Sequence, residues 1–254
     1  MREHLDTTAR ALAALAAGLA ALSGCSAGSD STDGADPPTG GSLTVMEDWR
    51  GCDAFGDFEQ LEEYLGATGL DGQLQSDGLG EGIDAEAAGC AGRFDLASFE
   101  DTQGTFEFAV TGDAAVRSGI APWSEETAAS ENFAERVDQR RQNLPGIEYT
   151  DESEEELGDG WDEGLSIAAD TDNRFYLDVY GRHGDWVVYL SIDVLHDPGI
   201  DAYETAPEFY PGNSAEQMAV YPFTTDQLVD WVAQEYLPQV RSDILQLAEN
   251  EERQ

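Results

Sequence analysis

The chain has 254 residues, and its 12 basic residues, all arginines, face 53 aspartates and glutamates, which gives a formal net charge of −41 at pH 7. A surface this negative repels phosphate backbones, and it lacks the basic residues through which proteins bind nucleic acid or lie flat on anionic lipid. The composition therefore excludes a nucleic-acid partner and attachment to a membrane through surface charge, while the length allows one large domain or two small ones.

The amino terminus has the pattern of a secretory signal. An apolar run at residues 11–22 follows Arg2 and Arg10, and it is shorter than the roughly 20 residues of a membrane-spanning helix. The sequence Leu22-Ser23-Gly24-Cys25 then resembles a bacterial lipobox. The resemblance implies a signal peptide at 1–24 that is removed and a Cys25 that receives a diacylglycerol thioether. The alternative is ordinary secretory cleavage with Cys25 incidental.

A tether is expected behind the lipid. Residues 26–42 carry no large apolar side chain, so they cannot bury enough surface to offset the entropy of ordering. We expect residues 25–42 to form a lipid anchor and flexible tether that spans about 20 to 25 Å. One extracytoplasmic domain should follow at 43–254.

The cysteine count agrees with lipid on Cys25. The chain has three cysteines, and an odd number in an exported protein leaves one thiol to explain. If Cys25 carries lipid, Cys52 and Cys90 remain as an even pair in an oxidising compartment, where a disulfide is expected. A metal pair and a redox pair are the alternatives, although neither cysteine belongs to a CxxC motif.

Three helical segments are predicted in the domain. The spacing of Phe55, Phe58, Leu61 and Leu65 predicts a helix over 55–66 that Gly66 ends. A second helix should begin after Ser124 as its N-cap and carry Phe133, Val137 and Leu144 on one face. A third begins with a capping-box pattern at 224–227 and runs to about 247, with a kink or two abutting helices at Pro238.

Alternating apolar residues predict strands at 106–110, 175–179 and 186–194. The sequence Gly181-Arg182-His183-Gly184 between the last two predicts an antiparallel hairpin, and residues 165–168 add a neighbouring strand. Residues 66–92 are glycine-rich, and we expect an irregular loop there. Together these elements indicate an α+β fold in which a largely antiparallel sheet is packed with helices in a single domain.

Two histidines are candidates for chemistry. His183 lies in the expected hairpin turn, and His196 precedes the turn sequence Asp197-Pro198-Gly199. Placement in turns is one interpretation of both, and a role beside carboxylates in a hydrolase is the other. The nearest approach to a nucleophile elbow, at 164–168, lacks the final glycine and follows an acidic stretch. No pattern assigns a catalytic residue, a cofactor or a metal ligand.

The stretch 151–164 places eight carboxylates around Trp161. One interpretation is a solvated acidic loop. The other is a cation or ligand site at Asp159, Trp161, Asp162 and Glu163. The same choice applies to the whole surface, which is suited either to solubility in a salty medium or to binding calcium or a cationic ligand.

With these elements in place, the chain is similar to a family of actinobacterial lipoproteins that carry a domain of unknown function. The similarity covers most of residues 45–250. The chain departs from the pattern of this family after Cys90, where the family has an aromatic residue close behind and this chain has Ala91-Gly92-Arg93. The resemblance implies a location and a disulfide, and it brings no catalytic residues. It rests on Cys52, Leu65-Gly66, Cys90, the middle helix, Leu157-Gly158-Asp159 and the hairpin that follows.

The sequence therefore predicts a lipoprotein on the extracellular face of the cell membrane. Its domain should bind an envelope protein or a small ligand without catalysis and without a cofactor. The alternative is an extracytoplasmic hydrolase that uses His183 or His196 with carboxylates.

Overall fold

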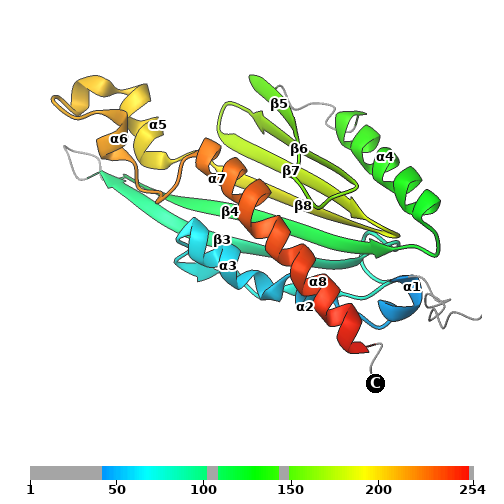
Figure 1. Ribbon diagram of the computed structural model, residues 1–254. Helices are drawn as coiled ribbons and strands as arrows, with labels where there is room; N and C mark the ends of the chain where they lie inside the picture. Colours follow the sequence, from blue (N-terminus) through cyan, green and yellow to red (C-terminus); the bar gives the residue numbers. More distant parts are fainter. Residues whose placement is uncertain (1–41, 102–107, 143–148, 252–254) are drawn as a thin grey trace, which may run out of the picture. The chain divides into compact units, whose positions relative to one another are not determined.

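The computed structural model describes residues 42–101, 108–142 and 149–251 (Figure 1). The predicted signal peptide, Cys25 and all but the last residue of the predicted tether lie outside these ranges. That last residue, Ser42, begins α1, and its backbone N–H donates to the Asp185 carboxylate at 2.7 Å.

An open antiparallel sheet of eight strands forms the centre of the domain, as the sequence predicted. The strands follow the order β1-β3-β4-β8-β7-β6-β5, and β2 also pairs with β3. The strand bounds are β1 Gly69–Leu70, β2 Gln75–Asp77, β3 Ala88–Asp101, β4 Phe108–Pro122, β5 Asp151–Glu156, β6 Glu163–Asp170, β7 Arg174–His183 and β8 Trp186–Leu195.

Helices cover both faces of this sheet. Helix α4 contacts β7 and β8 on one face, whereas α2 contacts β3 and β4 on the other face, where α8 also lies (Figure 1). The α-helix bounds are α1 Ser42–Val45, α2 Gly51–Ala54, α3 Glu59–Leu65, α4 Glu126–Gln142, α5 Pro198–Thr205, α6 Ala215–Met218, α7 Thr225–Trp231 and α8 Leu237–Glu251. A π-helical segment, Val232–Tyr236, joins α7 to α8.

The predicted hairpin is confirmed as β7 and β8. Alternate residues of both strands, from Phe175 to Val179 and from Trp186 to Val194, are buried in the core beneath α2, α3 and α8. The turn is Gly184-Asp185, where Gly184 has a φ of 57° that favours glycine. His183 is therefore the last residue of β7, opposite Trp186, and not a turn residue as predicted. Residues 165–168 lie in β6, as predicted.

The long strands β3 and β4 are the main error of the sequence prediction. The start of β3 falls within the expected loop 66–92, and only the first few residues of β4 were predicted as strand. These strands are hard to predict because small residues interrupt their apolar pattern. The small residues allow neighbouring elements to approach closely: a Cβ at Gly51 of α2 would clash with the backbone of Gly89 in β3. Val110 was expected in the core but is 38% exposed. Phe106 lies outside the described residues.

The helix predicted over 55–66 is present as a 3₁₀ turn at Gly56–Phe58 followed by α3, and α2 precedes it as a separate helix. The break occurs because Asp57 and Phe58 adopt positive φ angles of 50° and 61°. This strained backbone places the Phe58 ring in the core, edge-on to Phe94 at 6.4 Å between ring centroids. Gly66 ends α3 in the left-handed conformation, as predicted.

The other two predicted helices also form. Helix α4 begins at Glu126, after the predicted cap, and Leu144 lies outside the described residues. Thr224 and Gln227 make the predicted capping box of α7. Pro238 has no N–H for the carbonyl of residue 234, and the preceding turn widens into the π segment. Trp231, Val232 and Leu237 keep helical backbone angles, so α7 runs through this segment into α8 without a break.

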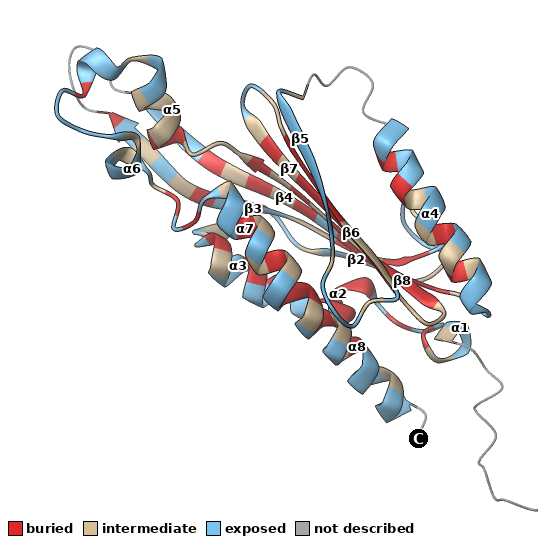
Figure 2. Ribbon diagram, turned by 45° about the horizontal axis from the view of Figure 1, so that its top comes forward, coloured by how far each residue is buried: buried red, intermediate tan, exposed pale blue. Residues whose placement is uncertain are grey.

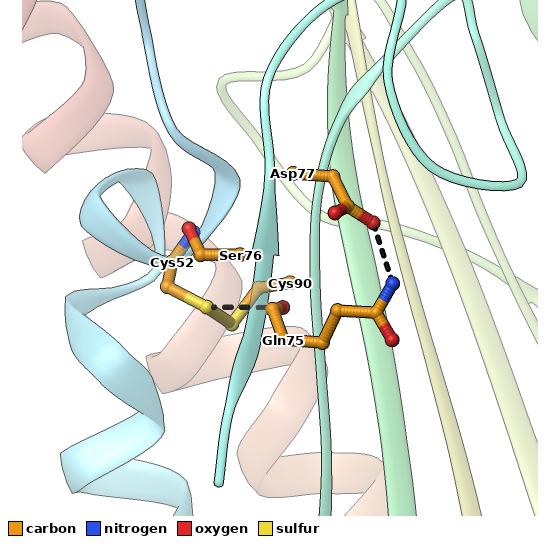
Figure 3. The surroundings of a disulfide bond; sticks show 5 residues. All are labelled: Cys52, Gln75, Ser76, Asp77 and Cys90. Carbon is orange, nitrogen blue, oxygen red and sulfur yellow. Dashed lines mark hydrogen bonds between the residues drawn. A yellow bond between two sulfur atoms is a disulfide. The ribbon is translucent and has the colours of Figure 1, made fainter.

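A disulfide between Cys52 of α2 and Cys90 of β3 is present (Figure 3). Both cysteines are buried. The Cys52 N–H donates to the Ser76 hydroxyl at 3.2 Å, and the Cys52 sulfur lies 3.4 Å from the Gln75 carbonyl oxygen. The bridge therefore joins α2 to β3, and the contacts of Cys52 join α2 to β2 as well.

Removing this bridge should destabilise the domain. We expect the Cys52→Ala/Cys90→Ala variant to lose about 4 kcal/mol of unfolding free energy, because the bridge closes a 38-residue loop in the unfolded chain. Urea unfolding followed by circular dichroism measures the loss. A reductant should weaken the wild type by a similar amount and leave the variant unchanged; equal effects on both would contradict the prediction.

Candidate ligand cleft

Two neighbouring cavities lie at the end of the sheet where β6 and β8 finish. The larger, about 350 Å³, is lined by β5, β6 and α7. The smaller, about 240 Å³, is lined by the end of β8, by α5 and by residues 221–225. Asp170, Phe175 and Thr225 line both, so the cavities adjoin. We call the two together the acidic cleft.

Carboxylates dominate the walls of the acidic cleft, and no arginine lines it. His196 is the only basic side chain among its lining residues. The larger cavity is lined by the carboxylates of Asp151, Glu152, Glu155, Asp170, Asp226 and Asp230, and the smaller by those of Asp170, Asp197, Asp201 and Glu204.

The alternation of β5 divides its carboxylates between two environments, since successive side chains of a strand point to opposite faces. Glu154 turns toward α4, where Arg141 donates two hydrogen bonds to it at 2.8 and 2.6 Å. Asp151 and Glu155 turn toward α7 and line the cleft, and no described arginine forms an ion pair with either. The cleft side of β5 therefore keeps its negative charge.

His196 and Asp170 meet on the wall that the two cavities share. Asp170 ends β6 and His196 follows β8, and β7 lies between these strands. The His196 backbone N–H donates to the Asn173 carbonyl at 3.0 Å. This positions the ring so that Nε2 lies 3.1 Å from Asp170 Oδ1. The aromatic rings of Phe175 and Phe223 complete the wall of the smaller cavity.

Asp197 lines the same cavity but has a structural role. Its Oδ1 accepts hydrogen bonds from the backbone N–H groups of Gly199 and Ile200 at the start of α5, at 2.9 and 3.2 Å. Its Oδ2 accepts from the N–H groups of Val220 and Tyr221, at 2.8 and 2.7 Å. Asp197-Pro198-Gly199 is thus the capped start of a helix and not the turn that the sequence suggested.

Asp201 is the cleft carboxylate with the most perturbed environment. Burial raises its pKa above the ordinary value, the nearby His196 opposes this, and the charges of Glu204 and Asp197 add to it. Beside it, burial raises the pKa of Tyr221, so that the phenol stays neutral. The Tyr221 hydroxyl is buried and has no hydrogen-bond partner among the described residues.

The carboxylates of the cleft are spread along its walls. Among the residues that the structure describes, no three His, Cys, Asp or Glu side chains converge closely enough to hold a metal ion. A compact divalent ion needs several oxygen ligands at once, at about 2.0 to 2.6 Å. The arrangement suits instead a ligand whose positive charge is distributed over several groups.

The loop predicted as a ligand site lines a different cavity, of about 530 Å³, between α4 and the turn that joins β5 to β6. Its charges are already matched. Arg182 donates to Glu163 at 2.8 Å and to Asp162 at 3.4 Å. Asp162 also accepts from the Gly184 N–H at 2.7 Å. Asp159 is exposed in the turn.

Trp161 is held in place by the core. Its ring lies edge-on to Trp186, with 5.9 Å between ring centroids, and the Arg241 guanidinium lies over it at 5.7 Å. A Cβ at Gly181 would lie 2.6 Å from Cε3 of Trp161, so glycine at that position of β7 lets the indole rest on the strand. Trp161 thus joins this loop to the hairpin.

Neither histidine completes a hydrolase arrangement among the described residues. The His183 ring packs against Trp186 at 5.4 Å between centroids, and its Nδ1 is buried without a described hydrogen-bond partner. His196 has its carboxylate, Asp170, but no described serine or threonine hydroxyl is hydrogen-bonded to it. Ser166 is buried within β6 and does not stand on a turn between strand and helix.

No protein-family model matches this chain, and no curated protein or solved structure is significantly similar to it. Over the described residues, none of the helices combines the length and the apolar character needed to span a membrane.

The state of Asp201 predicts a pH dependence of stability. Because its pKa is raised in the folded state, the folded chain binds more protons than the unfolded chain between the ordinary and the raised value. Stability should therefore fall as the pH rises through that window, and the loss should persist above it. Asp201→Asn should remove this loss. The variant should therefore be more stable relative to wild type at pH 7 than at pH 3. Urea titrations at both values measure the difference, and a pH-independent difference would contradict it.

Proposed function

We propose that this chain is a lipid-anchored binding protein of the cell envelope, held by Cys25 at the extracellular face of the membrane. In this proposal the acidic cleft receives a positively charged ligand, and the protein acts without catalysis. Glu152 lies 3.9 Å from Arg140. The observation that carries the proposal is the set of the other cleft carboxylates, among them Asp151, Glu155, Asp226 and Asp230, with which no described arginine forms an ion pair.

The anchor rests on the lipobox sequence and on charge. A net charge of −41 opposes contact with anionic lipid, so attachment needs a covalent lipid. Acyl chains contribute about 0.8 kcal/mol for each buried CH₂ group, which makes two or more chains a firm anchor. The Cys52–Cys90 disulfide is what an oxidising compartment outside the cytoplasm favours.

The cleft differs from the α4 face of the sheet in how many of its carboxylates form ion pairs with arginine. On the α4 face, Arg140 pairs with Asp178 and Arg141 with Glu154, and below them Arg182 pairs with Glu163. In the cleft, Glu155 of β5 lies with Asp226 and Asp230 of α7 around one cavity, without such partners. Like charges gathered around a cavity repel, and a cation that enters relieves this repulsion and is attracted from a distance.

One observation favours a second function, a hydrolase of the envelope. His196 and Asp170 form the pair in which a carboxylate orients an imidazole as a general base. In that case His196→Ala would abolish turnover of a hydrolysable substrate, and Asp170→Asn would reduce it. The binding function requires no such loss, and we propose it first because no described hydroxyl is hydrogen-bonded to His196 as a nucleophile.

The anchor is tested by Cys25→Ser in the native cell. We expect this variant to be released unlipidated or to remain as the precursor, because serine has no thiol to accept the thioether. Membrane fractionation and intact-mass measurement show the outcome. Ser23→Ala, which keeps a small side chain in the lipobox, should stay anchored. A Cys25→Ser protein that is processed and anchored like wild type would refute the lipid at this position.

The cleft is tested with spermine, a linear tetra-amine. Glu155→Gln/Asp226→Asn/Asp230→Asn should bind spermine at least about tenfold more weakly than wild type at low salt, since each exposed charge pair contributes roughly 0.5 kcal/mol. Titration calorimetry measures the affinity, and added NaCl should weaken wild-type binding. Glu59→Gln/Glu62→Gln/Glu63→Gln removes equal charge from α3 and should bind like wild type; equal losses in both variants would show attraction to net charge alone.

A further inference from the structure

One edge of the sheet is open. Strand β5 ends the strand order and pairs only with β6 among the described strands. Its register against β6 runs without a shift from Asp151 to Glu156, and all six residues are exposed (Figure 2). In an antiparallel pair every second residue turns its N–H and C=O away from the partner, so β5 presents a regular row of backbone groups at this edge.

The opposite edge is treated differently. There β3 is covered by two short strands, β1 of two residues and β2 of three, and an isolated bridge joins Arg50 to Gly78 beyond them. Short edge strands are one of the ways in which proteins prevent unwanted pairing. Strand β5 has none of the backbone devices that serve this purpose, since it contains neither proline nor a bulge.

Charge decides which strand can pair with β5. Five of its six residues are carboxylates, so a second copy of β5 would bring like charges opposite one another, which is destabilising. The chain's own segments outside the structure also fit poorly. Residues 26–41, 102–107 and 143–148 contain no lysine or arginine, residues 252–254 contain one arginine and are too short for a strand of six, and residues 1–24 are the predicted signal peptide. The complementary occupant is a basic segment of another polypeptide.

We propose that β5 is the docking strand for a basic, extended peptide segment, which adds to the sheet at this edge. This inference rests on the proposed function, because the acidic cleft lies beside the same strand. Side chains of an added strand alternate between the two faces. Those on one face meet Asp151, Glu155 and the α7 carboxylates of the cleft. Those on the other face meet Glu152 and Glu154, which already pair with Arg140 and Arg141, so the basic side chains of the peptide belong on the cleft face.

Backbone pairing and charge make separate contributions to this mode of binding. In strand addition, main-chain hydrogen bonds give affinity and alternate side chains give specificity. A flexible polyamine can satisfy the carboxylates but not the backbone groups of β5. A peptide of equal charge should therefore bind more tightly than spermine, and only if its amides are free to donate.

The test uses the full-length protein in detergent and three probes of equal charge. These are spermine, an eight-residue terminally capped peptide of alternating lysine and valine, and the same peptide with every backbone amide N-methylated. We expect the unmodified peptide to bind at least tenfold more tightly than its methylated analogue in titration calorimetry. Hydrogen exchange should slow at the alternate amides of β5 with the unmodified peptide and stay unchanged with spermine.

The outcomes separate this inference from the proposed function. If the three probes bind alike, or if the peptide protects amides outside β5, strand addition is wrong and the cation cleft stands. If none binds at low salt, the proposed function fails as well. The variant Glu155→Gln/Asp226→Asn/Asp230→Asn should weaken all three probes, whereas Glu59→Gln/Glu62→Gln/Glu63→Gln should weaken none.

Discussion

The structure depends on the distribution of a small number of arginines among a much larger number of carboxylates. With 12 arginines against 53 carboxylates, each guanidinium decides which part of the fold is neutralised. Arg174, for example, joins three strands, since it extends from β7 to Asp113 of β4 and Asp193 of β8. Arg140 and Arg174 pair with carboxylates of the sheet, whereas no described arginine lines the cleft between β5 and α7.

Helix α4 shows the structural use of these charges. Its buried apolar residues are Ala129 and Val137, and two of its arginines contact the sheet beside them. Arg140 is buried against Asp178 with its guanidinium over the Tyr149 ring, and Arg136 lies over the Tyr189 ring while pairing with Asp84. Removing one partner of a buried ion pair leaves an uncompensated buried charge, so the Arg140–Asp178 pair fixes the position of α4 in addition to its apolar contacts. Arg141 of the same helix pairs with Glu154 of β5, whereas Asp151 and Glu155 of β5 line the cleft.

Much of the fold could be predicted from local patterns. The β7–β8 hairpin lies in the middle of the sheet, and its apolar residues at every second position, such as Leu190, Ile192 and Val194, are buried, so its sequence period and its burial agree there. The capping box at Thr224 and the left-handed Gly66 are chain-local signals and were readable. Strands β3 and β4 were not readable, because their small residues serve close contact with α2 and with the Tyr189 ring, which only the assembled layers create.

The candidate site was predicted only in part. The acidic stretch after residue 150 was recognised, but as a loop around Trp161, and its strand β5 faces the cleft through Asp151 and Glu155 instead. The other wall comes from Asp226 and Asp230, which in the sequence are ordinary polar positions of a helix. No local pattern joins segments some 60 or more residues apart.

The sequence by itself determined the charge of this protein and the α+β class with its central hairpin, and it predicted the Cys52–Cys90 disulfide. These follow from composition, counting and period, which need no neighbours in space. Only the tertiary structure decided which carboxylates are neutralised, because an arginine can pair only with the carboxylates that the packed sheet and helices bring close to it. That choice leaves a cleft and an open acidic strand on one side of the sheet, and from it the function is proposed.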